Sequence, residues 1–384
     1  MAKSYLRNKT SPVSSLTQLA GNRVRGLSLE RTVPALALML VFAVCQPALA
    51  SWNGGLPGGI FNLPAGAWAS GMGGAVSADP AYMMSWYNPA QLPLLRDRRA
   101  SVGAGMRSLG RTEAWASYDF RVPPRAGMGL ALVYRGDPFI DGLYDGYYIG
   151  NEVVEERRLN SAAWSAVSLK IGTGYLITRR WSAGGSIGIN HQNLPTTPYP
   201  DGSIKSSSVT SIGALDIAAS YRMTPNLTLS AAAKNLLWRN DWAIHAYEDL
   251  TPVNEEVIPP VFVLASSHKT TLLERELVWN ADAVIYLIDG RGKYLGHPEM
   301  AVAAGAQWKF TDDIVLRAGL ADMELSGDIT WDSEQYWDSF SPRLTVGFSY
   351  SLSKWMKGAF VNYALMTDRV WAGADQQFDI TVSF

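Results

Sequence analysis

The chain has 384 residues, of which 47% are hydrophobic and only 17% are charged, against a usual charged share of about 25%. Mean hydropathy is −0.01, and no segment after residue 50 approaches the ~18 unbroken apolar residues of a membrane-spanning helix, which excludes a polytopic helical membrane protein. The 11% aromatic content argues against a disordered chain. Two classes remain: a large soluble domain, or a membrane β-barrel whose apolar residues are hidden by alternation.

Residues 1–50 have the pattern of a secretory signal peptide. Six basic residues and one acidic residue precede an apolar run at 33–44, and Ala48-Leu49-Ala50 follows as a cleavage site. The alternative is a transmembrane anchor, but the run is shorter than the ~20 residues that span a bilayer. The only cysteine, Cys45, lies in this segment, so cleavage leaves a chain without disulfides or a thiol nucleophile.

After cleavage, 27 basic and 33 acidic residues remain, a net charge of −6. No basic stripe indicates a nucleic-acid partner.

Residues 98–384 alternate between apolar and polar side chains with a period of two, which is typical of strands. In 300–310, for example, Val302 and Trp308 share one face, whereas Gln307 and Lys309 share the other. About fourteen strands are predicted, near 99–107, 113–122, 127–135, 162–175, 182–193, 208–222, 227–237, 260–270, 277–287, 298–310, 314–322, 342–352, 356–366 and 375–384. Tight linkers alternate with long ones, as periplasmic turns and extracellular loops do in outer-membrane barrels. We therefore predict an all-β, transmembrane antiparallel barrel in the bacterial outer membrane, in contact with its lipid.

Aromatic residues support this interpretation because amphipathic rings favour the membrane interface. One predicted girdle includes Tyr175, Trp181 and Trp355 at the periplasmic ends, and the other includes Tyr134 and Trp238. The chain also ends in an alternating segment that closes with Phe384. This ending resembles the signal that the barrel insertion machinery reads.

Residues 51–97 are rich in Gly, Ala, Pro and aromatics and show neither helical nor strand periodicity. A fourteen-stranded cylinder is wider than one that its own wall side chains can fill, so we expect this segment to plug it. The alternative is a flexible leader, but a mobile tail gains nothing by exposing Trp68, Trp86 and Tyr87. The predicted organisation is a signal peptide at 1–50, a hatch at 51–97 and the barrel at 98–384.

The plug region carries a motif that resembles the N-terminal region of the FadL-like outer-membrane superfamily, especially its PorV/PorQ branch. The matching residues are Pro64, Gly66, Gly71, Gly73, Gly74, Asp79, Asn88, Pro89 and Ala90. The resemblance implies a fourteen-stranded barrel whose N-terminal segment folds into the lumen as a hatch.

No catalytic constellation is evident. The G-x-S-x-G match around Ser186 lies inside a predicted strand, whereas a nucleophile elbow needs a strand-turn-helix context. The four histidines have no metal-ligand spacing. We therefore expect neither an enzyme nor a metal or cofactor site.

Charged residues at inward-facing strand positions are the first candidate functional set. They are Arg107, Asp119, Arg135, Lys170, Asp216, Lys234, Asp282, Lys309, Arg317 and Asp379. Either they pair with one another and hold the hatch, or some of them line a polar path for solute.

Aromatic residues of the long loops are the second set, and include Phe139, Tyr144, Tyr148, Trp331 and Trp337. They suit an entry groove for an apolar ligand, a protein-docking surface, or packing between loops.

Two functions follow as hypotheses. The first is passive uptake of small, hydrophobic solutes through a hatch-gated barrel. The alternative, implied by the resemblance to PorV, is binding or shuttling of exported proteins at the cell surface.

Overall fold

The structure is a computed structural model. It describes residues 59–137, 144–149, 152–158, 164–193, 197–198, 204–205, 208–241, 255–287, 299–324, 342–367 and 373–384. The predicted signal peptide and the loop residues Phe139, Trp331 and Trp337 lie outside these ranges. No helix within them is long and apolar enough to cross a membrane.

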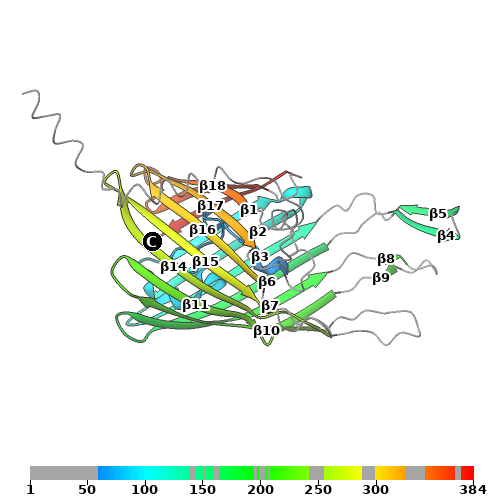
Figure 1. Cartoon of the computed structure of the whole chain (residues 1–384), viewed down its shortest axis with the longest axis horizontal. Helices are drawn as coiled ribbons and strands as arrows, with labels where there is room; N and C mark the ends of the chain where they lie inside the picture. The colour runs from blue at the N-terminus through cyan, green and yellow to red at the C-terminus, as the bar shows by residue number, and fades with distance from the viewer. Residues whose placement is uncertain are drawn as a thin grey trace, which may run out of the picture. The chain divides into compact units, whose positions relative to one another are not determined.

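Fourteen strands of the described ranges form a closed antiparallel barrel (Figure 1). In barrel order they are β1 (Arg99–Met106), β2 (Thr112–Val122), β3 (Ala126–Asp137), β6 (Trp164–Leu176), β7 (Trp181–Asn193), β10 (Ser208–Arg222), β11 (Leu227–Leu236), β14 (Val261–Leu272), β15 (Arg275–Tyr286), β16 (Glu299–Lys309), β17 (Ile314–Glu324), β18 (Arg343–Ser351), β19 (Ala359–Thr367) and β20 (Ala374–Ser383). β1 pairs with both β2 and β20, which closes the ring. The predicted fold is confirmed, and the strands begin and end within a few residues of their predicted bounds.

Alternation explains which way each side chain points. On β2, Trp115 and Asp119 face inward and are buried, whereas Met128, Leu130 and Leu132 on β3 face outward and are 41–43% exposed. Large apolar side chains remain exposed on the outer face of many strands, which is the surface a membrane would cover.

The barrel has two different ends. At the short-turn end, strands are joined by tight turns such as 123–125 and 223–226; at the long-loop end, several connections are much longer, such as 138–163 and 237–260. The connection between β1 and β2 at the long-loop end is short and contains a 3-10 turn, η4 (Ser108–Gly110).

The long loops contain three two-stranded pairs that the sequence pattern did not predict. They are β4 (Tyr144–Ile149) with β5 (Glu152–Arg158), β8 (Thr197–Pro198) with β9 (Ile204–Lys205), and β12 (Arg239–Asp241) with β13 (Glu255–Val257).

The hatch lies in the lumen and contains four short helices. They are η2 (Gly59–Asn62), α3 (Ala67–Gly71), α4 (Met84–Tyr87) and η3 (Pro89–Leu94). Most of their side chains are buried, and Trp68, Met72, Met84 and Trp86 belong to the main apolar core. The helices are too short to show the 3.6-residue periodicity on which sequence prediction depends.

Glycines on opposite walls allow the hatch to dock by its backbone. A Cβ on Gly127 (β3), Gly174 (β6) or Gly184 (β7) would lie 2.3–2.6 Å from backbone atoms of Leu92 or Pro89.

A second glycine patch lies seven strands further around the ring of fourteen, which is the opposite wall. There, a Cβ on Gly305 (β16) or Gly319 (β17) would lie 2.4–2.6 Å from the backbone of Met72 or Gly73. The hatch is therefore held in recesses of two facing walls.

Tyr175, Trp181 and Trp355 are exposed near the short-turn end, as a girdle there would require, whereas Trp238 is buried and cannot belong to the other girdle. Asn235 and Leu237 adopt positive φ angles of 59° and 60°, which breaks the alternation as the chain leaves β11. Trp238 is consequently buried, with its ring 5.1 Å from that of Phe61 in the hatch.

Candidate functional site

Among the pockets that the described residues line, two adjoin the hatch inside the barrel, one on each side of it. The loop-side pocket has a volume of about 80 Å³ and the turn-side pocket about 290 Å³. Gly73 and Ser77 line the first, whereas Asp79 and Tyr82 line the second. The hatch segment 73–82 therefore forms the partition between them.

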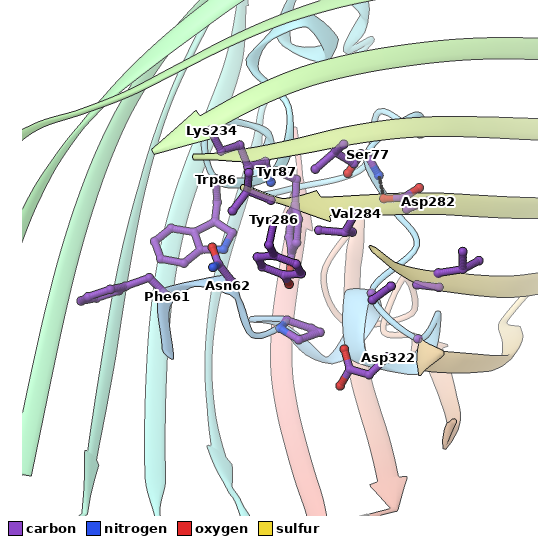
Figure 2. A pocket seen from close by; sticks show the side chains of 18 of the residues that line it. Phe61, Asn62, Ser77, Trp86, Tyr87, Lys234, Asp282, Val284, Tyr286 and Asp322 are labelled. Atoms are coloured by element: carbon purple, nitrogen blue, oxygen red, sulfur yellow. Dashed lines mark hydrogen bonds between the residues drawn. The ribbon is translucent and has the colours of Figure 1, made fainter. Parts of the chain in front are cut away.

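The wall of the loop-side pocket combines aromatic and aliphatic side chains with charged ones (Figure 2). Phe61, Trp86 and Tyr87 come from the hatch, Val261 and Val263 from β14, and Val284 and Tyr286 from β15. Small-molecule sites typically combine such a wall with a few polar groups that fix orientation.

Two lysines supply polar groups to this pocket. Lys170 Nζ pairs with Asp216 Oδ2 at 2.5 Å and lies 5.1 Å from the centre of the Trp86 ring. Lys234 Nζ lies 5.8 Å from the centre of the Tyr87 ring. Both ammonium groups are thus stabilised by aromatic faces.

Asp216 is a hydrogen-bonding centre of the wall. Besides Lys170, its carboxylate accepts from the Ser186 hydroxyl at 3.0 Å and the Asn235 backbone N–H at 2.9 Å. Ser186 therefore donates to a carboxylate rather than to a histidine base.

The turn-side pocket contains a polar network that joins the hatch to the wall. Arg317 Nε and Trp68 Nε1 both donate to Gln307 Oε1, at 2.9 and 3.0 Å. Arg99 Nη1 donates to the Ala81 carbonyl at 2.7 Å, which holds the hatch on its turn side.

Asp79 lines the same pocket and is 8% exposed. Burial raises the pKa of its carboxyl, and the charges of Lys269 and Arg99 oppose the rise only in part.

Three predicted lumen-facing carboxylates bind hatch backbone N–H groups. Asp379 accepts from Ala67 N at 2.8 Å, Asp119 from Met84 N at 3.1 Å, and Asp282 from Ser77 N at 3.0 Å. Ala67 and Met84 are the first residues of α3 and α4, neither of which has a side-chain cap of its own. Carboxylates of the barrel wall thus cap the N-termini of these two hatch helices, where negative charge is stabilising because it faces the positive end of the helix dipole.

Two hatch tyrosines lock the segment internally. Tyr82 Oη accepts from Trp68 N and donates to Asp379 Oδ2, both at 2.8 Å. Tyr87 Oη binds the N–H and the carbonyl of Ala65, at 2.8 and 2.6 Å. Burial is the main reason that the pKa of each phenol is raised.

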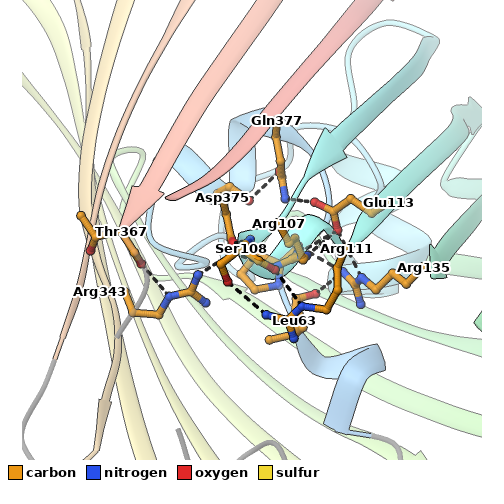
Figure 3. A network of polar contacts seen from close by, with 12 residues as sticks. Leu63, Arg107, Ser108, Arg111, Glu113, Arg135, Arg343, Thr367, Asp375 and Gln377 are labelled. Carbon is orange, nitrogen blue, oxygen red and sulfur yellow. Dashed lines mark hydrogen bonds and ion pairs between the residues drawn. The ribbon is translucent and has the colours of Figure 1, made fainter. Parts of the chain in front are cut away.

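An arginine network joins inward-facing side chains near the long-loop ends of the strands (Figure 3). Arg107 bridges Glu113 at 2.8 Å and Asp375 at 3.0 Å, while Arg135 binds Glu113 at 3.2 Å and Arg343 pairs with Asp375.

Both Arg107 and Arg135 also donate to hatch carbonyls: Arg107 to Pro64 at 2.7 Å, and Arg135 to Leu63 at 2.8 Å. Sequence reasoning selected these two arginines but missed Glu113, Arg343 and Asp375. The alternation of the strands could have identified them, because these charged residues occupy inward-facing positions near strand ends.

The structure places the remaining predicted residues as follows. Gly66, with φ 96°, precedes α3, and Asn88 caps η3 through Ala90 N at 3.0 Å and donates to the Ser77 carbonyl at 2.6 Å. Lys309 is an exception among the lumen candidates, because its strand ends there: the side chain is 46% exposed and pairs with Asp312 at 3.2 Å. Tyr144 and Tyr148 lie on β4, apart from the barrel sheet.

No group of His, Cys, Asp and Glu side chains in the described ranges could hold a metal ion.

Comparisons with known proteins find similarity at the level of structure. The toluene transporter TodX of P. putida aligns with a TM-score of 0.53 and 13% identity over 83% of this chain and 97% of its own. The toluene transporter TbuX of Ralstonia pickettii gives 0.51 and 13% over the same shares, and a Pseudomonas aeruginosa FadL homologue gives 0.51 and 14% over 84% and 98%. No family model matches the sequence, and no curated protein matches it.

The chain therefore has the closed fourteen-stranded fold of the FadL-type barrels. Two of these neighbours are toluene transporters. The similarity to the PorV/PorQ branch stays a prediction.

Proposed function

We propose that this protein is an outer-membrane channel for the passive uptake of small hydrophobic solutes, gated by its hatch. The observation that carries the proposal is the position of the hatch between two pockets, the outer of which includes a cluster of aromatic and aliphatic side chains. The fold shared with two toluene transporters supports the same solute class.

Pocket size supports the gating part of the proposal. A dry cavity of about 150 Å³ is known to bind benzene, whereas the loop-side pocket measures about 80 Å³. A monoaromatic ring therefore needs side chains or the hatch to shift before it enters. The turn-side pocket, at about 290 Å³, is already large enough.

The test is uptake of a radiolabelled monoaromatic hydrocarbon by cells that carry the protein in their outer membrane. Val263→Trp should fill the loop-side pocket and reduce uptake severalfold. Leu264→Trp is the matched control, since the adjacent side chain faces outward and is 56% exposed. Equal uptake by both variants and by the unaltered protein would contradict the proposal.

The exported-protein alternative stays a prediction. It is implied by the family resemblance, and the loop aromatics Phe139, Trp331 and Trp337 that could form a docking surface lie outside the described residues.

A further inference from the structure

The two pockets approach each other along one wall of the barrel. On β15 the inward-facing residues run Glu276, Val278, Asn280, Asp282, Val284. Val278 lines the turn-side pocket and Asp282 the loop-side pocket, so Asn280 alone stands between them on this strand. Because every second residue of a strand faces inward, successive inward-facing side chains are about 7 Å apart, and Asn280 is the single side chain between the two pockets.

The hatch is equally thin at this level. Ser77 lines the loop-side pocket and Asp79 the turn-side pocket, which leaves Ala78 as the partition. Ala78 packs in an apolar cluster with Ala265 of β14, and Ser77 N donates to Asp282 at 3.0 Å (Figure 2). We call this contact, between hatch residues 76–79 and strands β14 and β15, the seam.

Buried polar atoms without a protein partner gather at the seam. Asn280 and Ser267 lie directly opposite each other on β15 and β14 and are 4% and 3% exposed. Neither the amide oxygen and nitrogen of Asn280, nor the hydroxyl of Ser267, nor Asp282 Oδ1 has a hydrogen-bond partner within the described structure. Asn280 approaches the Asp79 carboxyl without a hydrogen bond of normal geometry. Buried polar groups of this kind are normally satisfied, by water if not by protein.

On five other strands the hatch backbone lies directly against the wall. On β3, β6 and β7 and on β16 and β17, hatch backbone occupies the space of the missing glycine Cβ atoms. The inward-facing positions of β14 and β15 carry no glycine, and the hatch is held there by hydrogen bonds to Asp282.

We propose that the seam is the route past the hatch, and that it passes water and small uncharged hydroxyl-bearing solutes between the two pockets. Asn280 is the constriction, and it supplies hydrogen bonds together with Ser267 and Asp282. The proposal deepens the proposed uptake function, because it adds polar molecules to the solutes that the barrel would accept.

Cysteine accessibility tests the route without measuring uptake. The chain has one cysteine, Cys45, so Asn280→Cys and Ser267→Cys can be made on a Cys45→Ala background in the folded, membrane-inserted protein. A small hydrophilic methanethiosulfonate should modify both at least ~10-fold faster than Ser117→Cys, because thiol reactivity follows access. Ser117 is a buried control whose hydroxyl binds Ser101 at 2.8 Å on the β1–β2 wall. Equal, slow labelling at all three sites would overturn the seam.

Liposome swelling in glycerol tests passage itself. Asn280→Leu, which keeps the side-chain size and removes the amide, should slow swelling severalfold. Asn190→Leu is the matched control, since Asn190 on β7 is also buried and unpartnered but lines neither pocket. Unchanged swelling with Asn280→Leu would overturn the route.

The two proposals can fail separately. If the unaltered protein takes up no hydrocarbon but Asn280→Cys is labelled rapidly, the proposed uptake function is wrong and the proposed route through the seam is retained. Normal hydrocarbon uptake with slow labelling would do the reverse.

Discussion

At the scale of single residues, carboxylates of the wall determine where the hatch sits. Asp119, Asp282 and Asp379 each accept a backbone N–H from a different part of the hatch. All three come from the inward-facing positions that alternation predicts, but their partners are far away in sequence. Ala67 and Asp379, for instance, are 312 residues apart, and no local pattern encodes such a pair.

Asp79 should make docking of the hatch dependent on pH. Its pKa is raised in the folded protein, mainly by burial, so the docked hatch binds its proton more tightly than a released hatch does. Docking should therefore weaken as pH rises from the usual carboxyl pKa of 3.8 toward the raised value, and strengthen on acidification. Hydrogen exchange of residues 76–82, corrected for the intrinsic rate, should show more protection near pH ~4 than near pH ~7.

Asp79→Asn should reduce this pH dependence. The control is Asp312→Asn, because Asp312 lies in an exposed turn where Lys309 and Arg275 lower its pKa. Changing Asp312 should leave exchange in the hatch as it is. Protection that falls on acidification of the unaltered protein would contradict the assignment.

At the scale of elements, η3 depends on the glycines behind it. Gly184→Ala would place a Cβ 2.6 Å from the Pro89 carbonyl carbon, whereas Gly185→Ala, one residue along, meets only the Asp216 carbonyl oxygen at 3.1 Å. Because η3 would have to move as a unit, we expect Gly184→Ala to lower the free energy of unfolding by about 1–3 kcal/mol. Gly185→Ala should cost less.

The measurement for this pair is urea unfolding of each variant in matched detergent. Equal midpoints for Gly184→Ala and Gly185→Ala would mean that the hatch does not press on this wall.

Strands were predictable from the sequence because alternation is a local signal that repeats along each ribbon. In β16, alternate residues from Val302 to Trp308 face outward as expected. The prediction failed where the backbone left that regularity, as at Asn235 and Leu237, whose positive φ angles carry Trp238 inward. The hatch was recognisable by composition, but its short helices are defined by contacts with the wall, which no window of sequence contains.

At the scale of the whole molecule, the two ends of the barrel sequence close the ring. Arg98 and Phe384 exchange two backbone hydrogen bonds, at 3.1 and 3.0 Å, and the Phe384 ring stacks 6.3 Å from Tyr118. The residue is 61% exposed, so it remains accessible beyond the last strand. Its role as an insertion signal stays a prediction.

Deletion of Phe384 and its replacement by alanine should separate closure from recognition. Deletion removes both backbone bonds, each worth about 0.5–1.5 kcal/mol, whereas Phe384→Ala keeps them and removes only the ring. We expect deletion to lower the temperature at which the folded barrel unfolds on semi-native gels, and the alanine variant to lower it less. If the alanine variant folds normally from urea but inserts poorly in cells, recognition by the insertion machinery is the affected step.

The two facing glycine recesses have a consequence for biogenesis. Their strands come from opposite halves of the chain, β3, β6 and β7 from the first and β16 and β17 from the second. Because the backbone of the hatch is seated in both recesses, we expect the wall to assemble around it, with the early strands receiving η3 before the late strands reach residues 71–73. The pairing of β20 with β1 would then enclose a plug that is already in place.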